Sequence, residues 1–130
     1  MLHFPGWHSI PAYRNITLSI RFPIFYTVLQ MITHIVYFWM KSDAGQEGHD
    51  QFMQGAKHLL TIEDLAQGYV GKPADTEKRD IVDDSYDYAL ITIFDTIEAH
   101  DRYQVHPKHD DFRALAPLWE RVQIYDSTIL

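Results

Sequence analysis

Two segments of the chain predict β-strands that are apolar on both faces. They are MITHIVYFWM (31–40) and YDYALITIFD (86–95), which are rich in β-branched and aromatic residues and contain no glycine or proline. Successive side chains of a strand point to opposite sides of its sheet, so a polar set of alternate residues would indicate a solvated face. Neither segment has such a set. The sheet that contains them must therefore be covered on both faces.

The chain is too short to provide both covers. Its 130 residues suffice for one domain with one core. Around the two strands, the pattern predicts a helix within 42–60, a short strand within 65–73, a charged loop at 74–85, two helices between 95 and 116, and a closing strand at 119–127. This order predicts an α+β, ferredoxin-like split βαβ fold with an antiparallel four-stranded sheet. Because its helices cover one face, we expect a second copy of the sheet to cover the other, in a symmetric homodimer.

The first predicted helix has one apolar side. That side consists of Phe52, Met53, Ala56, Leu59 and Leu60, which recur at helical spacing. His49 and His58 are expected on the opposite, solvated side.

The two later helices carry signals at their starts. Asp95 and Glu98 are spaced like the N-cap and third residue of a capping box. His106 is expected at the N-cap of the last helix, because Pro107 fits the first helical turn and cannot lie inside a longer helix. The inward side of this helix is expected to hold Phe112, Leu115 and Ala116.

Residues 1–30 differ in charge from the rest of the chain. They hold two basic residues, Arg14 and Arg21, and no acid, whereas residues 31–130 carry a net charge of −9. We therefore divide the chain into an N-terminal extension (1–30) and a domain (31–130). Three interpretations of the extension stay open: a miscalled start with Met31 as the initiator, a targeting or membrane-surface arm, or an extra strand or cap on the domain.

The composition argues against several classes of function. The net charge of −7 argues against a nucleic-acid or anionic-membrane partner, since phosphate contacts need clustered lysine and arginine. The chain has no cysteine, which excludes disulfides and thiolate sites and is compatible with a cytoplasmic location. No glycine-rich phosphate loop, G-x-S-x-G or HExxH motif is present, so no cofactor is expected.

The run RYQVHPKHDD (102–111) concentrates groups that can move protons. A neutral imidazole can accept a proton from a carbon acid, and a phenol can hydrogen-bond the enolate that develops. Tyr103 and His109 are the candidates from this run, and His34 would approach them from the floor of the sheet. The competing interpretation is structural, with a helix start at His106, a packed tyrosine and a core histidine. A metal site at His106 and His109 lacks a clear third ligand, so no metal is expected.

Three segments together resemble a known family. ITHIVYFWMK, DYALITIFDTIEAHDRYQVHPKH and VQIYD are similar to sequences of the stress-responsive A/B barrel (Dabb) family, over about residues 31–127. The resemblance implies a homodimer in which two four-stranded sheets close into an α/β barrel, with a cleft between sheet and helices in each protomer.

One branch of this family, the olivetolic acid cyclase type, shares the Tyr-x-x-His-Pro-x-His run and a histidine in the first strand. The resemblance implies that Tyr103, His106, His109 and His34 occupy the matching places of a polyketide-cyclising site. The cyclase pattern also has a histidine early in its third strand, where this chain has Tyr88.

We therefore expect a small dimeric protein that binds a hydrophobic or carbonyl ligand in the cleft. The catalytic candidates are His109, Tyr103 and His34, and the residues expected to line the cleft are Phe38, Tyr88, Phe94 and His106. Two alternatives are a cofactor-free cyclase or isomerase with His109 as its base, and a structural stress-response protein without a ligand.

Overall fold

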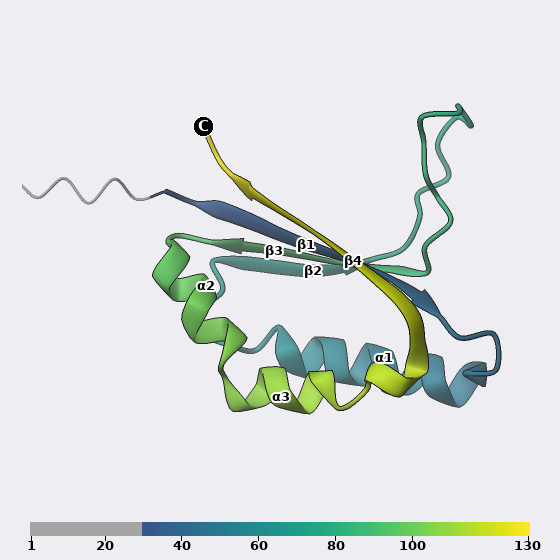
Figure 1. The fold of residues 1–130 in the computed structure, drawn as a ribbon, viewed down its shortest axis with the longest axis horizontal. Helices are drawn as coiled ribbons and strands as arrows, with labels where there is room; N and C mark the ends of the chain where they lie inside the picture. Colours follow the sequence, from purple (N-terminus) through teal and green to yellow (C-terminus); the bar gives the residue numbers. More distant parts are fainter. Residues whose placement is uncertain (1–29) are drawn as a thin grey trace, which may run out of the picture.

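The computed structural model describes residues 30–130. Its elements follow in the order β1 (Ile32–Met40), α1 (Gly45–Leu59), β2 (Gln67–Gly71), β3 (Tyr88–Phe94), α2 (Ile97–Gln104), α3 (Pro107–Arg113), the 3₁₀ helix η1 (Ala116–Leu118) and β4 (Trp119–Thr128). The strands form one antiparallel sheet in the order β2-β3-β1-β4, and the helices lie on one side of it (Figure 1). This confirms the predicted ferredoxin-like α+β fold.

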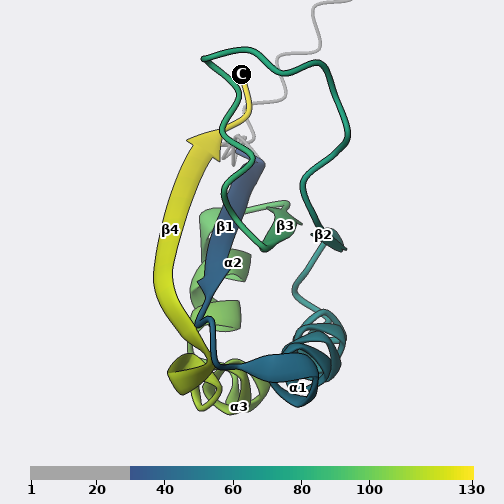
Figure 2. The same cartoon turned by 90° about the vertical axis from the view of Figure 1, so that its right-hand side faces the viewer.

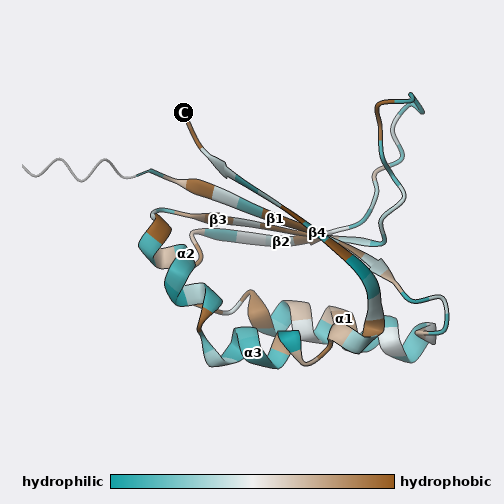
Figure 3. Cartoon of the chain, viewed as in Figure 1, coloured by the Kyte–Doolittle hydropathy of each residue, from teal (hydrophilic) through white to brown (hydrophobic). Residues whose placement is uncertain are grey.

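The two sides of the sheet differ in cover. Along β1, the residues that face the helices are buried and those between them are half-buried. The helix-facing set consists of Ile32, His34, Val36, Phe38 and Met40. The other set consists of Thr33, Ile35, Tyr37 and Trp39. Figure 3 shows a strongly hydrophobic stretch in β1. No helix of residues 30–130 covers the side of the sheet that faces away from α1, α2 and α3, which we call the open side.

The core lies between the sheet and helices α1 and α3. Phe52, Ala56 and Leu59 of α1 are at most 1% exposed and pack in one cluster with Phe112 of α3. Gly55 lets α1 pack closely against Leu115, in the turn that follows α3, because a Cβ atom at position 55 would lie 2.3 Å from a methyl carbon of Leu115.

The predicted start of α2 is wrong by one residue, and the predicted start of α3 is confirmed. The N-cap of α2 is Thr96, whose hydroxyl accepts a hydrogen bond from the backbone N–H of Ala99, so the helix starts one residue later than the Asp95 capping box predicted. His106 caps α3 as predicted: its Nδ1 accepts from the backbone N–H of Lys108, and proline occupies the first turn. Ala116 is exposed rather than inward, because α3 ends at Arg113 and a 3₁₀ turn follows.

The long connection 72–87 between β2 and β3 extends away from the helices (Figure 2), as expected for a charged loop. Within residues 30–130, no helix is long and apolar enough to cross a membrane. The interpretations offered for the extension concern residues 1–29, which lie outside the described residues.

Candidate functional site

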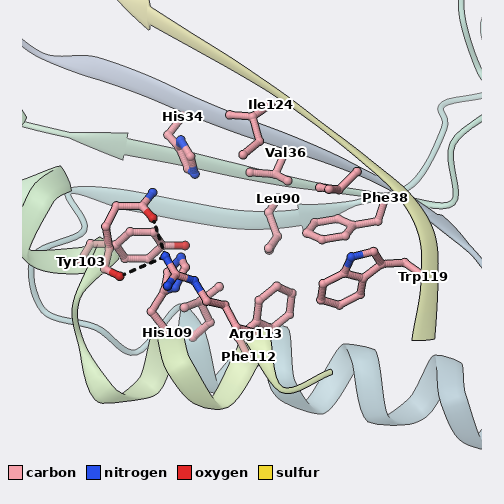
Figure 4. A pocket seen from close by; sticks show the side chains of 13 residues that line it. His34, Val36, Phe38, Leu90, Tyr103, His109, Phe112, Arg113, Trp119 and Ile124 are labelled. Carbon is pink, nitrogen blue, oxygen red and sulfur yellow. Dashed lines mark hydrogen bonds between the residues drawn. The ribbon is translucent and has the colours of Figure 1, made fainter. Parts of the chain in front are cut away.

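A cavity of about 240 Å³ lies between the helix-facing side of the sheet and helices α1, α2 and α3. Its walls come from β1, β3, β4 and all three helices, and most of them are apolar (Figure 4). The lining residues are His34, Val36, Phe38, Leu59, Leu90, Tyr103, Gln104, His109, Phe112, Arg113, Trp119, Val122 and Ile124. A concave, largely apolar space with a few convergent polar groups is the usual form of a small-molecule site.

One end of the cavity, which we call the aromatic end, is formed by Phe38, Phe112 and Trp119. The ring centroid of Phe38 lies 5.7 Å from that of Phe112 and 4.9 Å from that of Trp119, and Phe112 stacks on Trp119 at 5.5 Å. Aromatic pairs at such separations add stability beyond the area they bury.

The opposite end, which we call the polar end, contains Tyr103, His109 and His34. Tyr103 lies in the last turn of α2, and the helix break at Pro107 turns the chain toward it. The ring of His109 in α3 therefore meets the ring of Tyr103 edge-on, with 4.9 Å between the ring centroids. His34 points at this pair from β1, with its ring centroid 6.2 Å from that of Tyr103 (Figure 4). The structure therefore brings the three catalytic candidates together at one place.

His109 is the group of this end whose protonation is most affected by its surroundings. Burial lowers the pKa of its imidazole from 6.5 to about 4, and the positive charge of Arg113 acts in the same direction. Its buried Nδ1 has no hydrogen-bond partner among the described residues. The ring is therefore neutral at pH 7, and one of its nitrogens is left unsatisfied.

Tyr103 supplies the complementary group. Its side chain is 1% exposed, and burial raises the pKa of the phenol well above its ordinary value of 10.0. The phenol therefore stays protonated at neutral pH and can donate a hydrogen bond to a carbonyl or enolate oxygen.

His34 is held from the side by Asp126, its partner across the β1–β4 ladder. The Nδ1 atom of His34 lies 2.5 Å from a carboxylate oxygen of Asp126. Burial lowers the pKa of His34, and the hydrogen bond and charge of Asp126 act in the opposite direction. Because the net direction is downward, desolvation outweighs the carboxylate and the neutral imidazole is favoured at pH 7.

A cation lies beside the polar end. Arg113 of α3 lines the cavity, and its guanidinium is within 3.4 Å of the backbone and side-chain oxygens of Gln104 (Figure 4). The side chain is 60% exposed, so it can also meet a charged group that enters the cavity from solvent.

Three of the residues predicted to line the cleft lie elsewhere. Tyr88 stacks on Phe52 and its hydroxyl lies 2.7 Å from Nδ1 of His49, so it belongs to the packing of α1 on the sheet. This contact also makes His49 half-buried, so the prediction that His49 is solvated was wrong. Phe94 is fully buried behind the ring of Tyr103, and the ring nitrogen of His106 is used in its helix cap. Of the predicted lining residues, Phe38 does line the cavity.

Sequence reasoning did not place Asp126, Arg113 or His100 at the site; the ring centroid of His100 lies 4.9 Å from that of His34. His100 precedes Tyr103 by three residues on one helix, a spacing that places both on the same face and could have identified it. Asp126 follows from the register of β4 against β1, which the sequence pattern does not determine. Arg113 lies one turn after His109 on α3, and that spacing was available in the sequence.

Comparison with known proteins identifies one family and several solved structures with the same fold. Residues 32–129 match the model of the family described as Stress responsive A/B Barrel Domain. Among solved structures, a Dabb family protein from Mesorhizobium loti is 24% identical, with a TM-score of 0.63 over 78% of this chain and 98% of that one. A dimeric ferredoxin-like protein of unknown function from Thermobifida fusca is 20% identical, with a TM-score of 0.65 over 81% and 96%.

A third solved structure is a hydroxynitrile lyase from Passiflora edulis, which is 20% identical, with a TM-score of 0.66 over 78% of this chain and 95% of that one. No curated protein matches the sequence. At these identities the likeness to solved structures concerns the fold, and it agrees with the ferredoxin-like topology.

Proposed function

The chain belongs to the stress-responsive A/B barrel family, and we propose that it binds a small carbonyl compound with an apolar tail in the cavity between its sheet and its helices. The observation that carries the proposal is the meeting of Tyr103 and His109 at one end of an otherwise apolar cavity. A protonated phenol can donate to the carbonyl oxygen, while the aromatic end accommodates the tail.

The charge of the site supports a ligand that also carries a carboxylate. Arg113 is the one cationic side chain among the residues that line the cavity, and guanidinium groups pair well with carboxylates. A keto acid with an aryl tail would therefore use the aromatic end, the phenol of Tyr103 and the guanidinium of Arg113 together.

Two stable probes test this assignment. Benzoylpropionate carries an aryl ring, a ketone and a carboxylate, and phenylbutyrate differs from it only in lacking the ketone. We expect calorimetry to show tighter binding of benzoylpropionate by about three- to tenfold, the range of one hydrogen bond of about 0.5–1.5 kcal/mol. Equal affinities, or no binding of either probe, would contradict the proposal.

An acid–base enzyme is the second candidate function, and the unsatisfied Nδ1 of His109 favours it. One structural neighbour is named a hydroxynitrile lyase, so this fold supports an enzyme in at least that protein. A base with a pKa of about 4 has little driving force to remove a proton from carbon, which is why we rank binding first.

Proton exchange separates the enzyme from the binding protein. If His109 acts as a base, the protein accelerates exchange of the protons next to the ketone of benzoylpropionate in D₂O, as followed by NMR, and the His109→Gln variant does not. If neither protein accelerates exchange although wild type binds the probe, the binding role stands alone. A protein that neither binds nor exchanges the probe supports the third alternative, a structural role.

We also propose that a second copy of the chain covers the open side of the sheet. The half-buried apolar residues of β1 and the dimeric state named for the Thermobifida fusca protein support this. Sedimentation of wild type should give a dimer at micromolar concentration. Ile35→Glu, on the open side, should shift it to monomer, whereas Ile81→Glu, in the exposed loop, should not.

We propose a cytoplasmic location, with which the cysteine-free sequence is compatible. Fractionation of cells that express the full chain with a C-terminal tag tests this. Recovery of the protein with membranes or in the secreted fraction would contradict it.

A further inference from the structure

Behind the polar end of the cavity, three side chains from distant parts of the chain come together. They are His34 of β1, His100 of α2 and Asp126 of β4, and one nitrogen or carboxylate oxygen from each lies within 4.8 Å of the others. We propose that this cluster binds a divalent transition-metal ion such as Zn²⁺.

The donor set determines the class of metal. Two imidazoles and a carboxylate suit Zn²⁺ and the neighbouring first-row ions, whereas Mg²⁺ and Ca²⁺ prefer ligand sets made of oxygen alone. Donor atoms about 2.0–2.2 Å from a shared ion lie closer together than 4.8 Å, so binding requires the side chains to draw together around the ion. Three protein ligands leave further positions on the ion for water or for a ligand of the cavity.

The surroundings of His100 supply a separate argument. The side chain is 16% exposed, and its Nδ1 makes only a long contact of 3.4 Å with its neighbour Asp101. Its Nε2 lies 3.1 Å from the amide nitrogen of Gln104, and its ring centroid is 4.9 Å from that of His34. The contact of Nδ1 is long for a largely buried imidazole, and a metal ion would provide a stronger partner for this nitrogen.

Access and support for an ion are both present. Asp126 lies on the edge strand β4 with 55% of its side chain exposed, so an ion can enter from solvent. His34 is 5% exposed and packed in the sheet, which fixes one ligand before the ion arrives.

The surface contains a natural control. His58 and Asp111 form a second histidine–carboxylate pair, 3.5 Å apart and largely exposed, but this pair belongs to no three-residue cluster within residues 30–130. If a single histidine–aspartate pair were enough to bind the metal ion, His58 and Asp111 would bind it as well. The sequence also holds His3 and His8 in the N-terminal extension, and histidines are common metal ligands. A variant that lacks both is therefore needed to test whether they contribute to metal binding.

The experiment titrates Zn²⁺ into the chelator-stripped full chain by calorimetry and Co²⁺ by its visible absorption, with circular dichroism to check the fold of each variant. We expect about one high-affinity ion per chain, and a weakening of about tenfold or more in His100→Ala and in Asp126→Asn. His58→Ala and the double variant His3→Ala/His8→Ala should bind as wild type does. Asp126→Asn alters a mostly exposed side chain, so it tests the site even if His100→Ala does not fold.

The proposal is overturned if wild type binds no ion, if His58→Ala weakens binding as much as His100→Ala, or if the double variant abolishes it. Binding of benzoylpropionate is measured separately in chelator. Ligand binding without metal binding would reject the metal site alone, and metal binding without ligand binding would reject the proposed function alone.

Discussion

The aromatic end and the polar end of the cavity are both built mainly from rings, but those rings differ in their demand for hydrogen bonds. Phe38, Phe112 and Trp119 pack against one another, and none of their ring atoms is a buried polar atom without a partner. At the polar end, His109 keeps a buried nitrogen without a partner among the described residues. An unsatisfied buried polar atom costs about 1–3 kcal/mol, so the polar end weakens the fold that the aromatic end stabilises. The difference supports a role in stability and in holding the apolar tail of a ligand for the aromatic end, and a role in polar recognition for the polar end.

The largest effect on stability is expected at the aromatic end. Phe38→Ala removes a ring that is 2% exposed and contacts the rings of Phe52, Phe112 and Trp119. We expect a loss of about 3–5 kcal/mol in the free energy of unfolding, measured by urea denaturation. A loss below about 1 kcal/mol, typical of surface positions, would remove the contrast between the two ends.

A smaller effect is expected where the polar end meets the edge strand. Asp126→Ala leaves the buried His34 without its carboxylate partner, and we expect a loss of about 1–2 kcal/mol when the protein is kept in chelator. Asp111→Ala, which removes the carboxylate beside the exposed His58, should change stability by less than about 0.5 kcal/mol. Equal losses would mean that burial of the histidine does not matter.

The pH dependence of stability should report His109. Its pKa is 6.5 when unfolded and about 4 when folded, so between these values the unfolded chain binds more protons. The contribution of the neutral ring is therefore fully present above pH 6.5 and is lost as pH falls toward 4. Denaturation at a series of pH values should show a steeper loss in wild type than in His109→Gln. Parallel curves would contradict the assigned pKa.

The sequence pattern was sufficient for the fold and for part of the site. The order of predicted strands and helices leads to the ferredoxin-like topology, and Pro107 predicts the helix break that positions His109. Tyr103, His109 and His34 were predicted together and do lie at one end of the cavity.

The errors come from information that local patterns lack. Tyr88 and Phe94 share the helix-facing side of β3 with the cavity residue Leu90, but whether such a residue reaches the cavity depends on which helix lies above it. The position of Asp126 depends on the register of β4 against β1. A slip of one residue in that register would move the side chain of Asp126 to the other face of the sheet. Tertiary packing determines these positions, and local patterns in a single sequence do not predict that packing.

The central claim concerns the phenol at the polar end, and Tyr103→Phe tests it with the smallest structural change. Calorimetry should give the ratio of the dissociation constants of phenylbutyrate and benzoylpropionate for wild type and for the variant. We expect a preference of about three- to tenfold for the ketone in wild type, falling to about one in the variant, with phenylbutyrate bound equally by both. A preference that survives in Tyr103→Phe would contradict the assignment of the phenol as the carbonyl donor.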